Sequence, residues 1–101
     1  MAYTSNSIPS GDWITRTIKQ TKVDGATTPF ALPATALTGR RFITVYNGSG
    51  APLYLGDSGV TITNGLTLPN GSSMSLNLDA GVILYGIQAA AAGDIRVFEG
   101  A

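Results

Sequence analysis

The fold class is decided by the stretch RRFITVYNGSGAPLYLGDSGVTITNGLTLPNGSSMSLNL at residues 40–78, where short apolar runs alternate with turn signals. These runs are rich in β-branched and aromatic residues, which favour extended strands. The dipeptide Asn-Gly occurs three times, beginning at Asn47, Asn64 and Asn70. Both residue types tolerate the positive φ angles that tight hairpin turns use. Strands are therefore expected at residues 41–46, 53–55, 60–63, 66–68 and 73–78.

The C-terminal part of the chain continues this pattern. Residues 82–88 and 94–99 are expected to form strands, and the alanine run at 89–92 is expected to be a loop, because a single helical turn is marginal on its own. Only 12% of the residues are charged, which argues against a helical bundle with its charged outer faces. Together these signals predict an all-β fold, a compact antiparallel β-sandwich or jelly-roll-like barrel.

The N-terminal part is patterned less clearly. Residues 1–12 are rich in Ser, Thr and Asn and are expected to form a mobile arm. Residues 13–23 alternate loosely and contain no alanine, which indicates an edge strand or an arm that becomes ordered against a partner. Pro29 and Pro33 bracket a short piece that is expected to be an irregular or edge connection, since proline donates no ladder hydrogen bond.

The 101 residues suffice for one ordinary domain. On the patterning above, residues 1–33 form an extended arm and edge segment, and residues 34–101 form the β-sandwich domain. Because the clearest strand and turn signals lie downstream, removal of residues 1–23 is expected to leave the fold of residues 40–99 intact.

Charge and cysteine content narrow the range of partners. Six basic and six acidic side chains give a net charge of zero and form no dense basic stripe, so no nucleic-acid partner is expected. The chain has no cysteine, so stability is expected to come from packing or oligomerisation. The longest apolar stretch is interrupted by Gln88 and is too short to span a bilayer, and the N-terminus carries no secretory pattern. A protein made in the cytoplasm, with no membrane partner, is therefore expected.

The sequence contains no catalytic or metal-binding pattern. The tetrapeptide Gly56–Gly59 (GDSG) is similar to a serine-protease nucleophile motif, but the chain has no histidine to activate the serine. Most acidic residues lie beside glycines, where turns favour them. The lack of His and Cys argues against zinc, and the stretch 57–65 offers oxygen ligands without the spacing of a calcium loop. We therefore expect no enzyme activity, no cofactor, no metal and no small-molecule substrate.

A characteristic order of turns and strands runs through residues 31–100. Its elements lie at Leu32–Pro33, Leu37–Arg41, Phe42–Asn47, Leu55–Thr61, Leu66–Ser72 and Ile95–Val97. The series resembles a module of small β-sandwich virion proteins of tailed bacteriophages, among them capsid decoration (cement) proteins. The resemblance implies a structural protein on the capsid surface that bridges major capsid protein subunits and stabilises the assembled head. It also implies association with copies of itself, and a homotrimer is expected.

The N-terminal segment supplies the candidate partner-binding residues. The expected apolar anchors are Trp13, Ile14, Ile18 and Phe30, and the expected polar guides are Arg16, Lys19 and Lys22. Tryptophan is enriched at binding hot spots, and an unpaired arm can add a strand to another chain. The alternative is a receptor- or carbohydrate-binding module of a phage tail or fibre. The tyrosines that would face a sugar are Tyr46, Tyr54 and Tyr85, and the sequence leaves open whether they are buried or exposed.

Overall fold

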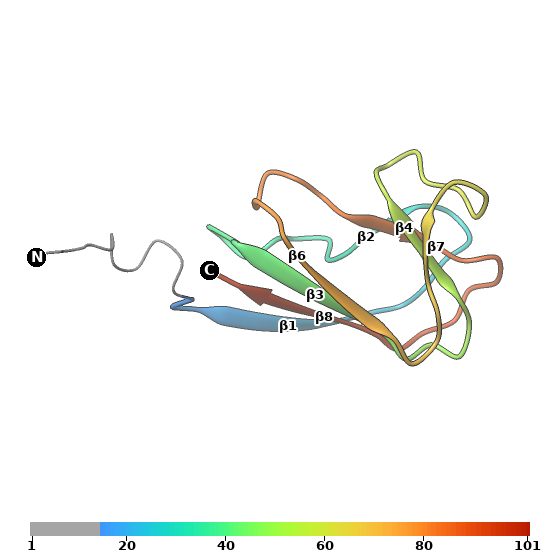
Figure 1. Cartoon of the computed structure of the whole chain (residues 1–101), viewed down its shortest axis with the longest axis horizontal. Helices are drawn as coiled ribbons and strands as arrows, with labels where there is room; N and C mark the ends of the chain where they lie inside the picture. The colour runs from blue at the N-terminus through green and yellow to red at the C-terminus, as the bar shows by residue number, and fades with distance from the viewer. Residues whose placement is uncertain (1–14) are drawn as a thin grey trace, which may run out of the picture.

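The computed structural model describes residues 15–101 and shows two four-stranded antiparallel sheets packed face to face (Figure 1). The strand order is β1-β8-β3-β6 in the first sheet and β2-β7-β4-β5 in the second. The strands are β1 (Ile18–Val23), β2 (Phe30–Ala31), β3 (Phe42–Asn47), β4 (Leu53–Gly56), β5 (Leu66–Leu68), β6 (Ser73–Asn77), β7 (Tyr85–Ile87) and β8 (Ile95–Gly100). Within residues 15–101 no strand of one sheet pairs with a strand of the other, so the expected β-sandwich is confirmed and the barrel alternative is not observed.

One apolar core lies between the sheets. Alternate residues of each strand point inward, as the period of two in a strand requires. The buried members of the core are Leu32, Ile43, Val45, Leu53, Leu55, Leu68, Ile95 and Val97. Burial of each such side chain contributes about 1.5–3 kcal/mol, so this cluster supplies most of the driving force for folding.

Residues 62–64 form a turn, and the strand expected at 60–63 is absent. The threonine and asparagine side chains here bond to the local backbone, which then has no need of a neighbouring strand. The Oδ1 atom of Asn64 accepts the N–H of Thr61 at 2.8 Å, and Thr61 Oγ1 accepts the N–H groups of Thr63 and Asn64. Val60 is the one residue of this segment that is buried.

Two of the three Asn-Gly steps, at Asn64 and Asn70, lie in turns, whereas Asn47-Gly48 lies at the end of β3. Only Gly71 adopts a positive φ, at 84°, so the expectation of positive φ holds at one step of the three. In all three the glycine N–H donates to a backbone carbonyl. The acceptors are Asp94 for Gly48 at 3.1 Å, Thr61 for Gly65 at 3.0 Å and Asn47 for Gly71 at 2.6 Å.

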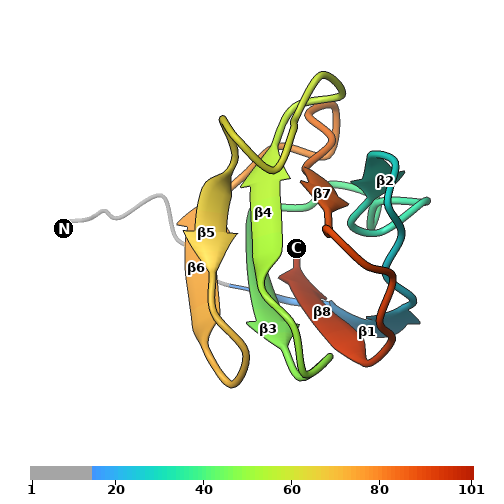
Figure 2. The same ribbon diagram turned by 90° about the vertical axis from the view of Figure 1, so that its right-hand side faces the viewer.

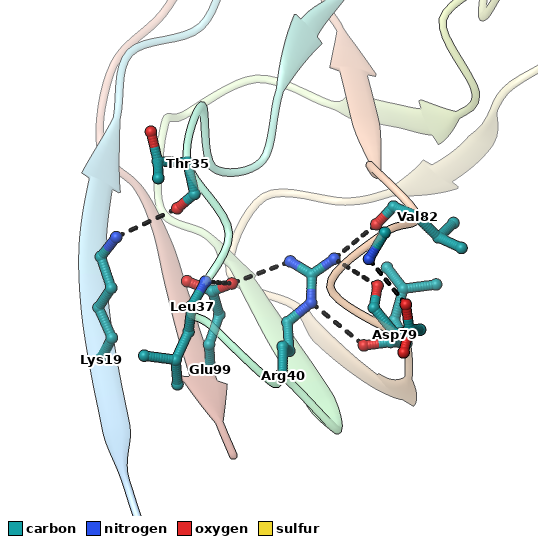
Figure 3. A network of polar contacts seen from close by, with 9 residues as sticks. Lys19, Thr35, Leu37, Arg40, Asp79, Val82 and Glu99 are labelled. Carbon is teal, nitrogen blue, oxygen red and sulfur yellow. Dashed lines mark hydrogen bonds and ion pairs between the residues drawn. The ribbon is translucent and has the colours of Figure 1, made fainter.

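A buried arginine, Arg40, fastens three segments at the end of the sandwich where β3 begins (Figure 3). Its Nη1 donates to Oε2 of Glu99 on β8 at 2.9 Å, and the two side chains are 1% and 0% exposed. Nε donates to the carbonyl of Leu78 at 3.1 Å, and Nη2 donates to the carbonyls of Asp79 at 3.1 Å and Val82 at 2.5 Å. Arg40 therefore ties the β2–β3 connection to β8 and to the β6–β7 connection.

The carboxylate of Glu99 completes this clamp from the inner face of β8. Its Oε2 also accepts the backbone N–H of Leu37 at 3.0 Å, so it holds both ends of the short lead-in to β3. Its Oε1 is buried without a hydrogen-bond partner among the described residues. Loss of one partner of a buried ion pair leaves an uncompensated charge, which costs about 3–5 kcal/mol.

A buried amide, Asn47, has the same role at the opposite end of β3. Its Nδ2 donates to the carbonyls of Ala51 and Leu68, both at 2.8 Å. Its Oδ1 accepts the N–H of Ser49 at 3.1 Å and the hydroxyl of Ser49 at 2.7 Å. Ser49 Oγ in turn accepts Nε2 of buried Gln88 at 2.9 Å, which ties the β3–β4 connection to the end of β7. Both ends of β3 are thus fixed by directional bonds.

The first 33 residues are partly built into the sandwich, which differs from the division drawn at residue 33. β1 pairs with β8 along its whole length, and β2 pairs with β7. Both are edge strands, as expected, but Val23 packs against the core and Leu32 lies within it. The polar side chains on both faces of β1 concealed this in the sequence. The arm expected at 1–12 lies outside the described residues.

We expect Arg40→Met to lower the free energy of unfolding by about 3–5 kcal/mol, because it leaves the buried Glu99 carboxylate and three carbonyls without their donor. Glu99→Gln leaves the buried Arg40 charge unpaired, but its amide oxygen still accepts from Arg40 and Leu37 and Arg40 keeps its three carbonyl contacts, so we expect it to cost less than Arg40→Met. Urea unfolding followed by circular dichroism measures both losses. Equal losses would show that the charge of Glu99, and not the number of hydrogen bonds that Arg40 makes, decides the stability of this end of the sandwich.

A chain that begins at Asp24 should unfold at a lower temperature than one that begins at Thr15, because only the second retains β1. Loss of β1 removes the ladder to β8 and takes Val23 out of the core. Thermal unfolding followed by circular dichroism compares the two chains. Equal midpoints would support the original expectation that residues 1–23 are dispensable for folding.

Candidate docking surface

The outward face of the β1-β8-β3-β6 sheet, here called the outer face, gathers exposed apolar side chains. Six large apolar side chains are exposed in residues 15–101, and three of them lie on this face. They are Ile18 on β1, Tyr46 on β3 and Phe98 on β8, which are 61%, 42% and 40% exposed. Because the core already takes the inward residues of these strands, apolar side chains on the other face serve no packing between the sheets.

Strand register arranges the outer face in three rows across the sheet. The rows are Ile18–Gly100–Phe42–Asn77, Gln20–Phe98–Thr44–Ser75 and Lys22–Arg96–Tyr46–Ser73. Apolar and aromatic residues lie toward β1, β8 and β3, whereas β6 contributes only small polar side chains. The outer face therefore has an apolar centre with a polar margin along β6.

An aromatic pair forms the centre of the outer face. The rings of Phe42 and Phe98 lie 6.2 Å apart between centroids at an interplanar angle of 41°, within the usual range for interacting rings. The Phe42 ring lies over Gly100, so close that a Cβ atom at position 100 would clash with it. The absence of a side chain at Gly100 on β8 thus leaves room for the Phe42 ring over this strand.

A depression of about 250 Å³ opens beside this pair. It is lined by Gln20, Thr21, Lys22, Thr44, Tyr46, Arg96, Val97 and Phe98. The Tyr46 ring is held against Gly48, where a Cβ atom would come within 2.7 Å of its Cε2. Enclosed small-molecule sites usually measure about 300–1,000 Å³, so this open hollow suits a side chain or a single ring presented by a partner.

The two positive charges that line the depression, on Lys22 and Arg96, each form an ion pair with a nearby aspartate. Lys22 lies directly opposite Arg96 in the register, an arrangement of like charges that is unfavourable by itself. Lys22 Nζ lies 3.3 Å from Oδ1 of Asp24, and Arg96 Nε lies 2.6 Å from Oδ1 of Asp94. These exposed pairs add little stability, but they leave the outer face nearly neutral.

Three of the sequence-predicted partner-binding residues lie on or beside the outer face. Ile18 and Lys22 point outward from β1, in the first and third rows. Arg16 precedes β1 and is exposed, and its backbone N–H donates to the carbonyl of Ala101 at 2.5 Å. The structure therefore brings these residues to one edge of the outer face.

Of the other four predicted residues, two are described, and neither lies on the outer face. Lys19 points to the inner side of β1, where its Nζ donates to the carbonyl of Thr35 at 3.1 Å. Phe30 is half-buried in β2 and packs against the core, so its apolar surface is already used in folding. Trp13 and Ile14 lie outside the described residues.

Most of the outer face was missed by the sequence-based site prediction. Phe42, Thr44, Arg96 and Phe98 were not proposed as partner-binding residues, and Tyr46 was named only for the alternative function. The sequence did hold a signal, because β3 and β8 carry apolar residues on both of their faces, the inward one and the outward one. A strand that is buried on one face and solvated on the other carries apolar residues on the buried face alone. Tyr54 and Tyr85, which were named with Tyr46 for that alternative, are half-buried in the second sheet.

Comparisons with family models, curated proteins and solved structures find no match for this chain. In residues 15–101 no group of three or more His, Cys, Asp or Glu residues lies close enough to hold a metal ion. The same part of the chain contains no helix long and apolar enough to cross a membrane.

Replacing Ile18 and Phe98 together by serine should lower the free energy of unfolding by only about 1 kcal/mol, because both side chains are largely exposed. The variant should also elute earlier from a hydrophobic-interaction column. Val97→Ala, which truncates a buried neighbour of Phe98 on the same strand, should cost about 2–3 kcal/mol and leave retention unchanged. A larger loss from the serine pair than from Val97→Ala would show that the outer face is part of the folding core.

Proposed function

We propose that this protein is a structural protein of a phage virion, of the capsid decoration kind, that docks on the assembled shell through its outer face. Its partner would be the major capsid protein, and it would contact more than one subunit of the shell. The exposed apolar side chains gathered on one sheet face, Ile18, Tyr46 and Phe98, are the observation that carries this proposal.

The composition of the outer face suits a protein partner. Aromatic residues and arginine are enriched at the centres of protein interfaces, and Tyr46, Phe98 and Arg96 lie in neighbouring positions here. The near-neutral charge avoids the cost of desolvating unpaired ions on contact. A broad face with an open hollow also matches a surface on another protein better than it matches a buried ligand.

The rigidity of the sheet favours the same function. β3 crosses the middle of the outer face, and the Arg40 and Asn47 side chains fix its two ends. A preorganised surface loses little conformational freedom when it binds, so more of the contact energy becomes affinity. The resemblance of residues 31–100 to small virion proteins of tailed phages adds support from the sequence.

The second candidate is a receptor- or carbohydrate-binding module of a phage tail or fibre. One observation favours it: the depression places the Tyr46 ring and the Phe98 ring beside the polar side chains of Gln20, Thr44 and Arg96. An aromatic ring next to planar hydrogen-bonding groups is the usual composition of a sugar site. Binding to shells and binding to host-surface saccharide separate the two candidates.

We expect the purified protein to bind assembled, undecorated shells of its phage and to raise their resistance to heat, with little affinity for the unassembled subunit. A site that spans several subunits exists only after assembly, and its occupation stabilises the assembled state by mass action. Co-sedimentation measures the binding, and light scattering on heating measures shell stability.

The double variant Tyr46→Ser with Phe98→Ser should weaken shell binding at least tenfold, about 1.4 kcal/mol. The matched control is Tyr54→Ser, which removes a tyrosine from the second sheet and should bind like the unaltered protein. Undiminished binding by the double variant would exclude the outer face as the docking surface. Competition by host-surface saccharide, together with absence from the shell, would favour the second candidate.

A further inference from the structure

The two sheets have four edge strands, and three of them are protected against pairing with another chain. β1 carries Lys19 and Lys22, and lysine is a common guard of sheet edges. β2 has two residues between Pro29 and Pro33, and β5 has three residues followed by Pro69. β6 is different: its five residues, SMSLN, include no charge and no proline. β6 is therefore an open edge in the described part of the chain.

The backbone of β6 has hydrogen-bonding groups free for a partner strand. Asn47 N–H donates to the carbonyl of Ser72, and Leu78 N–H donates to the carbonyl of Arg41, so the even-numbered residues here face β3. Because an antiparallel strand alternates its bonding direction, Ser73, Ser75 and Asn77 direct their N–H and C=O groups away from the sheet. Their side chains are also exposed.

We propose that β6 pairs with β6 of a second copy of this chain, antiparallel, about a two-fold axis at Ser75. In this register Ser75 faces its own counterpart, and Ser73 faces Asn77 of the second copy. These are the residues whose backbone groups are free, so each pair exchanges both of its hydrogen bonds. A two-fold contact uses the same surface on both subunits, which only a self-complementary sequence satisfies.

The side chains of β6 are self-complementary in that register. On the inner side, half-buried Met74 faces Leu76 of the second copy, and each covers apolar surface that the monomer leaves at the edge of its core. On the outer side, polar residues face polar residues. Strand β5 of the second sheet runs along the same side of the sandwich as β6 (Figure 2), and its Leu66 is 61% exposed.

Charge also favours a second copy as the occupant. The formal net charge of the chain is zero, so two copies do not repel each other as wholes, and no charged side chain lies within the paired strand. The resulting assembly is a dimer with one continuous eight-stranded sheet, in contrast to the trimer expected from the sequence resemblance. This pairing does not depend on what the outer face binds.

Sedimentation velocity on the full chain, from about 10 to 1,000 µM, tests the pairing. A dimer held by one pair of short strands is expected to dissociate within this concentration range. We expect a shift from monomer to dimer with concentration. Ser75→Lys places two lysines opposite each other at the axis and should abolish the shift. Thr67→Lys adds the same charge to the exposed face of the neighbouring edge strand β5 and should leave it unchanged.

Amide hydrogen exchange gives a readout that needs no variant. The N–H groups of Ser73, Ser75 and Asn77 should become protected as concentration rises, while those of Gln20 and Lys22, on the free edge of β1, stay unprotected. A trimer, a monomer at every concentration, or protection that develops at β1 and not at β6 would overturn the proposal. Shell binding is measured separately, so loss of the dimer with shell binding retained would leave the proposed function standing.

Discussion

The ion pair between Arg40 and Glu99 is the interaction on which the arrangement of the loops and of the first sheet depends. Apolar burial drives the two sheets together, but it has no direction and does not fix where the connections lie. The planar guanidinium supplies that direction, because it can satisfy its carboxylate and carbonyl acceptors only in one placement of each. Asn47 imposes a similar constraint at the other end of β3, so the strand in the middle of the molecule is held at both ends.

Because β3 is held at both ends, the two faces of the first sheet can have different roles. The inward residues of β3 and β8 fill the core, and the outward residues form a row-like aromatic and polar surface on a backbone that does not need to rearrange. β6 lies at the polar margin of that surface and also at the open edge of the sheet. Binding through the outer face and pairing through β6 therefore use different atoms, and a dimer would place two outer faces side by side, which multiplies weak contacts with a regular array of subunits.

The sequence predicted the all-β sandwich because strand period and turn residues agree locally through residues 40–78. It did not predict that β1 belongs to the sandwich, because the β1 side chains are polar on both faces and its place is decided by the backbone ladder to β8. The segment at 60–63 has strand-like residues, yet its side chains satisfy the backbone locally. The outer face depends on which strands become neighbours, so Phe98 and Tyr46 could be recognised as one surface only after β8 and β3 were paired.

The hydrogen bonds at the three Asn-Gly steps bear on chemical ageing. Asparagine followed by glycine is prone to deamidation, because the unhindered glycine nitrogen attacks the side-chain carbonyl carbon and closes a succinimide ring. In this fold each of those nitrogens already donates to a carbonyl, and the Asn47 amide is also buried and bonded on both sides. Ring closure must therefore wait for local opening of the chain at that step. The rate at which each asparagine is converted to aspartate thus reports how often the chain opens at its own position in the folded protein.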